Sequence, residues 1–194
     1  EIRQNICQAA VTATKAVKYD SVGTIEFLMD EESKFYFMEM NTRIQVEHPV
    51  TEMITGVDIV KHMIRSADKQ KLSIKQKDVK INGHAIECRI ISEDYRKDFK
   101  PSVGKINFYH APGGKDIRID SALYSGYEIP PFYDSMMAKL ITSGNTRLNA
   151  IKRMRSALEE FIVEGVENNL EFCYLTMFNS SFVTGRYTTQ FAND

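Results

Sequence analysis

Residues 39 to 47 alternate between polar and mostly apolar side chains, and this pattern predicts a strand with one polar face. The odd-numbered positions from Glu39 to Glu47 carry two carboxylates, two amides and one guanidinium. Alternate side chains of an extended chain point to opposite faces, so these groups would share a face. Pro49 disfavours helical backbone at His48 and would end the run. An edge strand with a solvated face has the same alternation, but amides and an arginine between carboxylates favour a reactive site.

Two strand-like runs just upstream predict a β-hairpin that leads into this segment. Gly23 to Met29 and Lys34 to Met40 are rich in apolar and aromatic residues, and they flank the polar residues 30–33. Such runs separated by a short polar stretch are typical of a hairpin. We take the loop to be residues 31–34.

This loop predicts a metal site. With four residues in the loop, Asp30 lies opposite Phe35, and Glu26 lies opposite Glu39 on the same face. Two carboxylates facing each other resist joint ionisation unless a cation lies between them. Asn41 adds a neutral oxygen, which completes an oxygen-only set suited to Mg2+. A loop with an odd number of residues would send the two glutamates to opposite faces and remove this argument.

Periodicity elsewhere predicts an α+β fold. Apolar residues at helical spacing predict helices from Ile2 to about Lys18, from Pro49 to Thr55 with a stop at Gly56, over Ile59 to Ile64, from Asn145 or Thr146 to Ile162, and from Asn168 to Phe178. Strands separated by Gly and Pro turns are expected at 83–91, 105–109, 115–120 and 136–142, as a twisted antiparallel sheet. Residues 182–194 are expected to form a tail packed by its aromatic side chains.

A change in composition predicts two domains. Between Gln70 and Asn82 the chain is rich in lysine and poor in large apolar residues, which is typical of a solvated connector. The expected parts are a first domain at 1–73, a connector at 74–82 and a second domain at 83–194. Because the chain starts at Glu1 and shows no leader, we expect it to be a piece of a longer protein.

Composition excludes several classes of function. A net charge of -1 argues against nucleic-acid binding, and no apolar run has the length of a membrane span. The three cysteines are far apart, so free thiols in a reducing, cytoplasmic setting are expected. We expect no zinc site, because the histidines do not cluster, and we find no glycine-rich phosphate loop.

In the second domain, the strand at 83–91 places Glu87 and Arg89 on one face. This pair alone is typical of an ion pair on a solvated edge.

Several segments together resemble one enzyme family. Residues 39–52 resemble the signature segment of biotin carboxylases. They run from Glu39 to Glu52 as Glu-Met-Asn-Thr-Arg-Ile-Gln-Val-Glu-His-Pro-Val-Thr-Glu. Similar matches lie at 23–27, 83–89, 110–114 and 130–136, so the resemblance spans essentially the whole chain. The shorter Glu-x-Asn-x-Arg core also occurs in other ATP-grasp enzymes. The match covers roughly the last two fifths of a biotin carboxylase, namely the C-terminal part of the ATP-grasp domain followed by the C-terminal antiparallel sheet with helices.

The resemblance implies that bicarbonate attacks the terminal phosphate of ATP, and that the CO2 of carboxyphosphate then reaches a nitrogen of biotin on a carrier protein. It implies site residues in the following roles. Glu26, Glu39 and Asn41 would hold Mg2+ or Mn2+ at the ATP phosphates, and Leu28 would contact the adenine. Arg43, Gln45 and Val46 would hold bicarbonate, and Glu47 would be the general base. Arg89 would stabilise the enolate-like oxygen of biotin.

The resemblance also implies partners. These are the biotin carboxyl carrier protein, carboxyltransferase subunits and a second copy of the chain in a homodimer. Three parents stay open: the acetyl-CoA carboxylase of fatty acid synthesis, a two-subunit pyruvate carboxylase and another acyl-CoA carboxylase. The fragment alone is expected to be inactive. Two alternatives stay open: another ATP-grasp ligase, such as a carbamoyl phosphate synthetase-like enzyme, and a non-catalytic module for dimerisation or carrier docking.

Overall fold

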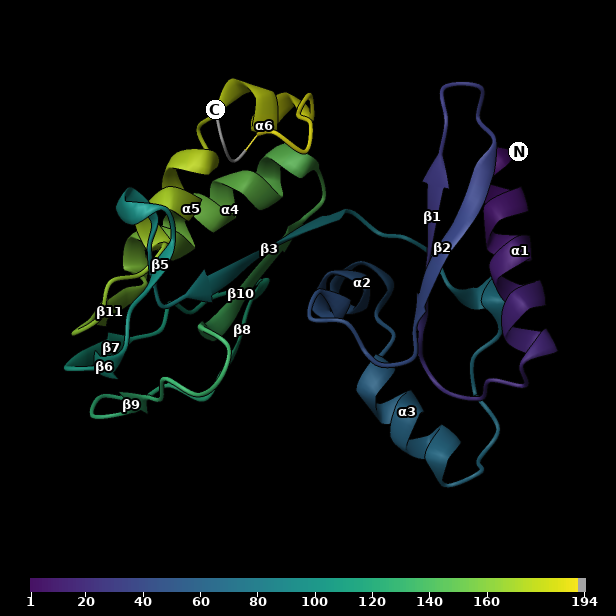
Figure 1. The fold of residues 1–194 in the computed structure, drawn as a ribbon, viewed down its shortest axis with the longest axis horizontal. Helices are drawn as coiled ribbons and strands as arrows, with labels where there is room; N and C mark the ends of the chain where they lie inside the picture. The colour runs from purple at the N-terminus through teal and green to yellow at the C-terminus, as the bar shows by residue number, and fades with distance from the viewer. Residues whose placement is uncertain (192–194) are drawn as a thin grey trace. The chain divides into compact units, whose positions relative to one another are not determined.

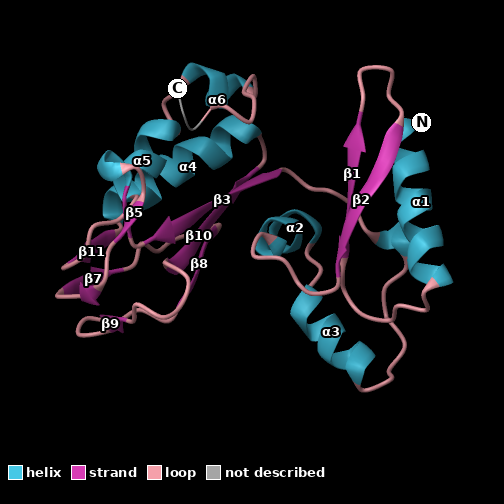
Figure 2. Ribbon diagram, viewed as in Figure 1, coloured by secondary structure: helices cyan, strands magenta, loops and turns pink. Residues whose placement is uncertain are grey.

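The structure is a computed structural model that describes residues 1–191. The chain folds into two compact units, Glu1–Lys80 and a second unit that begins at Ile81. Figures 1 and 2 show the elements of each unit. Within the described residues, no helix has the length and apolar character needed to cross a membrane.

The first unit combines one hairpin with helices. Its elements are α1 (Ile2–Ala16), β1 (Thr24–Met29), β2 (Phe35–Asn41), α2 (His48–Thr55), α3 (Ile59–Ala67) and the 3-10 turn η1 (Gln76–Asp78). Gly56 ends α2 in the left-handed region at φ 70°, a conformation that glycine adopts without strain. Asp58 caps α3 by accepting a hydrogen bond from the Lys61 amide. The predicted helices and hairpin of this unit are therefore present.

The turn of the hairpin differs from the prediction. The Asp30 amide donates to the Lys34 carbonyl at 2.9 Å, so Asp30 lies opposite Lys34 and not Phe35. The Asp30 carboxylate accepts from the Lys34 amide at 2.8 Å, and Ser33 adopts a positive φ of 66°. These contacts close a tight turn of three residues, an odd number.

A β-bulge restores the predicted pairing. From the turn the register runs Met29 to Phe35 and then Phe27 to Phe37, but the next pair is Glu26 with Glu39. One extra residue of β2, Met38, is left without a partner in the ladder, which returns the polar side chain of Glu39 to the face of Glu26. The predicted Glu26–Glu39 pair is confirmed, although the loop that led to it was wrong.

The second unit is an antiparallel sheet covered by helices, as predicted. Its three main strands are β3 (His84–Ile91), β10 (Met136–Gly144) and β8 (Ile117–Ser121), in the order β3-β10-β8. Smaller strands are β4 (Glu93–Asp94), β5 (Lys100–Pro101), β6 (Gly104–Lys105), β7 (Phe108–His110), β9 (Glu128–Ile129) and β11 (Ile162–Glu164). The helices are α4 (Arg147–Glu160), α5 (Leu170–Thr176) and α6 (Ser180–Thr184), with a 3-10 turn η2 at Tyr95–Lys97.

The core of this unit lies between α4 and the sheet. Helix α4 packs on β10 and β3 and against α5 (Figure 1). It begins where predicted, because the Thr146 hydroxyl caps it by accepting from the Asn149 amide. Leu140 of β10 and Ile151 of α4 are fully buried. Burial of such side chains is the main driving force that holds helix and sheet together.

One sequence expectation needs correction here. The strand predicted at 105–109 is split into β6 and β7 around Ile106, which is fully buried. Each half pairs with a different strand, β6 with β9 and β7 with β11, so the chain changes partner at Ile106. Of the predicted aromatic tail, Phe182 and Tyr187 stack at 5.8 Å between ring centroids. Residues 192–194 of that prediction lie outside the described residues.

The packing predicts that Leu140→Ala lowers the free energy of unfolding by about 2–5 kcal/mol, because it leaves a cavity in the centre of the sheet. Leu148→Ala in α4 is the matched control, since that leucine is 46% exposed. Urea denaturation of both variants measures the difference. Equal losses in the two variants would contradict the assignment of Leu140 to the core.

Candidate functional site

The polar cluster of the first unit is built on the paired strands of the hairpin. Because of the bulge, Glu26 and Glu39 face each other across β1 and β2. The Asn41 side-chain nitrogen donates to Glu26 Oε1 at 2.9 Å and to Glu39 Oε1 at 3.1 Å. One amide group therefore bridges both carboxylates, which brings all three predicted metal ligands together.

The position of this amide tests whether the cluster suits a divalent cation. The Asn41 nitrogen carries the positive end of the amide dipole and lies where two carboxylate oxygens converge, which is the place a cation would take. The Asn41 oxygen is turned to Arg43, whose Nη2 donates to it at 3.3 Å, so rotation of the amide would be needed to present that oxygen to a metal. Within residues 1–191 no cluster has three or more His, Cys, Asp or Glu side chains placed to hold a metal. The site fits an ion that takes few protein oxygens and completes its shell with phosphate and water, as Mg2+ does.

Beyond Asn41 the predicted strand is wrong. Strand β2 ends at Asn41, Arg43 lies in a bend, and Val46 and Glu47 form the turn that enters α2. A single polar face from Glu39 to Glu47 therefore does not exist. The chain leaves the sheet through residues 42–47 and enters α2 at His48, where Pro49 in the first turn is buried and compatible with helical backbone.

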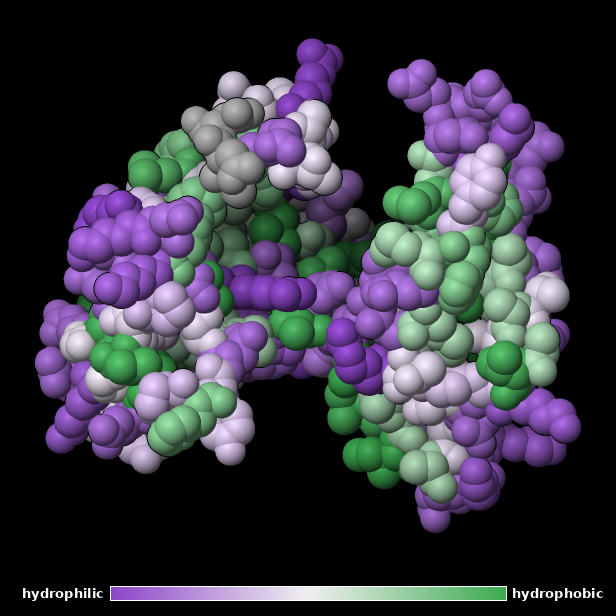
Figure 3. Space-filling model, viewed as in Figure 1, coloured by the Kyte–Doolittle hydropathy of each residue, from purple (hydrophilic) through white to green (hydrophobic). Residues whose placement is uncertain are grey.

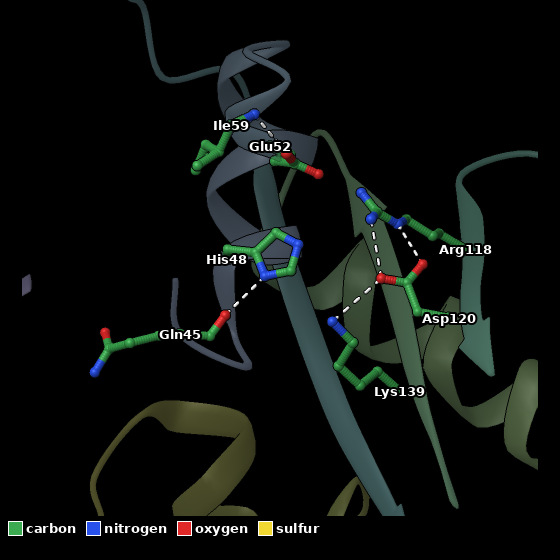
Figure 4. Close-up of polar contacts among 7 residues, drawn as sticks. All are labelled: Gln45, His48, Glu52, Ile59, Arg118, Asp120 and Lys139. Carbon is green, nitrogen blue, oxygen red and sulfur yellow. Dashed lines mark hydrogen bonds and ion pairs between the residues drawn. The ribbon is translucent and has the colours of Figure 1, made fainter. Parts of the chain in front are cut away.

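Hydrogen bonds fix the backbone of Gln45 and Glu47, on either side of Val46 in this turn. His48 Nδ1 lies 2.7 Å from the Gln45 carbonyl oxygen, and the Val50 amide donates to the Glu47 carbonyl at 3.1 Å (Figure 4). This role of His48 was not predicted, because the residue begins the helix and is not extended. A histidine followed by proline at a helix start was the available signal.

Glu52 is a second supporting residue that was not predicted from the sequence. Its Oε1 accepts from the Ile59 amide at 2.6 Å (Figure 4). Because this amide is one of the first of α3, it has no partner inside that helix. The contact joins α2 to the start of α3. It therefore helps to fix the position of α2, the helix that follows the turn at residues 45–47.

Exposed apolar side chains lie beside the polar cluster on its face of the hairpin. Leu28, two residues from Glu26 in β1, is 61% exposed. Tyr36 of β2 pairs with Leu28 and is 56% exposed on the same face, whereas the exposed Met29 and Phe37 belong to the other face of the hairpin. Hydrophobic surface is visible over the hairpin in Figure 3. An exposed apolar area beside clustered carboxylates is suited to a ligand with both an aromatic ring and charged groups.

In the second unit, Arg89 lies on the charged face of the sheet. It is exposed, whereas its neighbours Cys88 and Ile90 are buried on the core side. Across the ladder, Arg89 is in register with Lys139 of β10. Two cations opposite each other repel unless an anion is close to one of them.

Asp120 of β8 supplies that anion. Its carboxylate contacts Lys139 Nζ at 3.2 Å and Arg118 Nε at 2.8 Å (Figure 4). Burial raises the pKa of the Asp120 carboxyl, but the hydrogen bonds and charges of Arg118 and Lys139 outweigh it, so this pKa lies below its usual value. The Lys139 side chain, only 12% exposed, is thereby held to Asp120.

Comparison with known proteins identifies relatives of both units. The family model for the biotin carboxylase C-terminal domain matches residues 87–194, and the model for the carbamoyl-phosphate synthase L chain, ATP binding domain, matches residues 1–75. Biotin carboxylase 1 of Bacillus subtilis (strain 168) is 54% identical over 192 residues, which cover 98% of this chain and 43% of the relative. The 2-oxoglutarate carboxylase small subunit of Hydrogenobacter thermophilus is 48% identical, over all of this chain and 41% of the relative. The chain thus spans about two fifths of the length of these relatives.

Solved structures agree with this match. The biotin carboxylase domain dimer of Hydrogenobacter thermophilus 2-oxoglutarate carboxylase, in complex with MgADP, ADP and bicarbonate, has a TM-score of 0.94 at 48% identity, covering 98% of this chain and 42% of that one. A Campylobacter jejuni biotin carboxylase in complex with a β,γ-ATP ligand has a TM-score of 0.92 at 42% identity, covering 99% and 43%.

The ion pairs of Asp120 predict a specific dependence of stability on pH. Because the folded-state pKa is lowered, the carboxylate stabilises the fold above its unfolded pKa of about 3.9. That contribution is lost as the pH falls through the folded pKa. We expect the wild type to lose more stability than Asp120→Asn as the pH falls from about 5 to about 2, measured by urea denaturation at a series of pH values. Glu128→Gln, which removes an exposed carboxylate, is the control, and the same curve for both variants would contradict the prediction.

Proposed function

The chain belongs to the biotin carboxylase family, and we propose that its parent protein uses ATP and bicarbonate to carboxylate biotin. Bicarbonate attacks the γ-phosphate of ATP to form carboxyphosphate and ADP. Carboxyphosphate releases phosphate, and its CO2 forms a bond to a ring nitrogen of biotin. The observation that carries the proposal is the Asn41 amide bridging the paired Glu26 and Glu39 carboxylates on the hairpin, in a family whose relatives include an MgADP and bicarbonate complex.

The hairpin carboxylates have the role of holding the nucleotide through a metal. Glu26, Glu39 and Asn41 would hold Mg2+ or Mn2+, which when bound neutralises phosphate charge in the transition state. Leu28, exposed beside Glu26, would contact the adenine. A neutral amide between two carboxylates keeps them close together before the cation arrives, which lowers the cost of assembling the site.

The segment after β2 is assigned to bicarbonate. The guanidinium of Arg43 carries paired donors that suit a planar anion, and it lies exposed at the bend. Gln45 and the Val46 backbone lie in the turn held by His48 and would bind the same anion. Glu47 is exposed at the N-cap of α2, and it would remove the bicarbonate proton as general base.

Arg89 of the second unit is assigned to biotin. Loss of the proton from the biotin ring nitrogen to the phosphate that carboxyphosphate releases places negative charge on the ureido oxygen, and a fixed cation stabilises that charge. Arg89 is exposed on the sheet face, and the neighbouring Lys139 is held by Asp120. We assign no proton-transfer role to Arg89, because a guanidinium stays protonated in proteins.

The remaining assignments follow from the family. Residues 1–73 would be the C-terminal part of an ATP-grasp domain, 74–82 a connector and 83–194 the biotin carboxylase C-terminal domain. Relatives are biotin carboxylases or subunits of carboxylases, and one is a dimer. For the parent we propose a homodimer with a biotin carboxyl carrier protein and carboxyltransferase subunits as partners. We propose that it works in the cytoplasm, where free thiols such as buried Cys88 and Cys173 stay reduced.

The test of this function is ADP release by the full-length parent with ATP and Mg2+, with bicarbonate and free biotin each added or omitted. We expect ADP release to require bicarbonate, because carboxyphosphate forms first. We expect release to accelerate with biotin, because biotin consumes the carboxyphosphate. Release that requires bicarbonate but responds to ammonia and not to biotin would overturn the proposal in favour of another ATP-grasp ligase. The isolated chain is the negative control and should release no ADP.

The two arginines predict different kinetic defects in the parent. Arg43→Ala should lower bicarbonate-dependent ADP release with or without biotin by about 100-fold or more, because it acts before carboxyphosphate forms. Arg89→Ala should lower only the biotin-stimulated rate, by a similar factor of about 100.

Arg3→Ala, on the exposed surface of α1, is the control for loss of a guanidinium. Circular dichroism should find all three variants folded. A folded Arg43→Ala or Arg89→Ala variant with wild-type rates would refute the role given to that residue.

A further inference from the structure

Asn169 is a buried polar residue that contacts the strand carrying Arg89. It precedes α5 and is only 6% exposed. Its side-chain nitrogen donates to the Arg89 carbonyl at 2.9 Å, and its side-chain oxygen accepts from the Ile91 amide at 2.9 Å. Its own backbone amide donates to the Ile91 carbonyl at 3.3 Å. Three hydrogen bonds from one residue therefore hold the end of β3.

The sheet itself leaves this end of β3 weakly held. In the order β3-β10-β8, strand β3 has β10 on one side and is the edge on the other. The register of β10 against β3 is also irregular here, because Met137 is skipped between the pairs Met136–Ile91 and Ala138–Ile90. Peptide groups two residues apart on a strand point to the same edge. The Arg89 and Ile91 groups bound by Asn169 therefore lie on the outer edge, where Asn169 takes the place of a neighbouring strand.

We propose that Asn169 is a positioning residue that fixes the backbone of Arg89 for its action on biotin. This inference rests on the proposed function. Asn169 binds the backbone carbonyl of Arg89 itself. A shift of that peptide group would therefore move the whole guanidinium of Arg89. A misplacement of about 1 Å at a reacting group can lower the rate by about 100-fold. An arginine near the end of an edge strand needs such support, because strand ends open most easily.

Helix α5 makes Asn169 itself rigid. The Asn169 carbonyl accepts from the Cys173 amide at 3.0 Å, which ties it to the first turn of the helix. Cys173 and Met177 of the same region are buried in the core with Cys88 and Ile90 of β3. Packing thus sets the distance between the start of α5 and β3, and the Asn169 side chain spans it.

The preceding residue offers a matched control. The Asn168 side-chain nitrogen donates to the Val163 and Val166 carbonyls, and its oxygen accepts from the Leu170 amide at 3.1 Å. These partners lie in β11, in the loop that follows it and at the start of α5, and none lies in β3. Replacing Asn168 therefore disturbs the same segment without removing a bond to Arg89 or Ile91.

The experiment uses the full-length parent with the substitutions Asn169→Asp, Asn169→Ala and Asn168→Ala, and with free biotin as the probe. Asn169→Asp has nearly the same shape and keeps the acceptor for Ile91, but at neutral pH it cannot donate to the Arg89 carbonyl. We expect both Asn169 variants to lower kcat/KM for biotin by about 10- to 100-fold. ADP release that requires bicarbonate but no biotin should stay at the wild-type rate, as should both activities of Asn168→Ala.

The split between the two activities separates positioning from a purely structural role. Melting temperatures identify any variant that fails to fold, and Asn169→Asp keeps the test open if Asn169→Ala unfolds. An equal fall in both activities, or the same loss of biotin reactivity in Asn168→Ala, would overturn the inference. Wild-type kcat/KM for biotin in a folded Asn169→Asp protein would overturn it too. If the wild-type parent releases ADP without any response to biotin, the proposed function itself fails, and this result is visible before any variant is measured.

Discussion

The candidate site of the first unit rests on the pairing of Glu26 with Glu39. The two carboxylates face each other only because Met38 is bulged out of β2. Without that extra residue, the three-residue turn would place Met38 opposite Glu26 and direct Glu39 to the other face. The Asn41 amide then bridges the two carboxylates. A local irregularity of one strand thus decides whether an oxygen-rich cluster forms at all.

The second unit also has an irregular register between paired strands, next to Arg89. There the skipped residue Met137 lies opposite the end of β3, and the edge of that strand is held by Asn169 and not by a longer ladder. Bulges are common next to functional residues because they redirect a side chain at small cost. In both units the irregular register lies within one or two residues of an assigned polar side chain, Glu39 in one and Arg89 in the other.

Charge on the sheet face of the second unit is arranged so that two facing cations are tolerated. Lys139 and Arg89 are opposite each other in register, and Asp120 holds Lys139 while it also binds Arg118. Arg118 and Lys139 lower the pKa of the Asp120 carboxyl, so this group stays charged to a lower pH than it would without them. An anion placed on the far side of Lys139 therefore reduces the repulsion between Lys139 and Arg89.

Features that depend on neighbouring residues could be predicted from the sequence, whereas contacts between distant residues could not. Helix starts and stops at Thr146 and Gly56 follow from capping chemistry, and the buried-exposed alternation around Arg89 follows from strand periodicity. Family membership could also be predicted from the sequence, since it depends on the continuous run from Glu39 to Glu52. The end of β2 at Asn41 was not foreseen, because a polar alternation suits both an extended strand and the bend and turn that precede α2.

Contacts between distant residues are visible in the folded chain alone. The Glu26–Glu39 pair was predicted from a loop of the wrong length, and it holds because the bulge compensates for an odd turn. The contact of Asn169 with Arg89 joins residues 80 positions apart, and no local pattern marks it. Such contacts are set by how buried side chains of α5 and β3 pack together, and packing depends on the whole core and not on the preferences of any one segment.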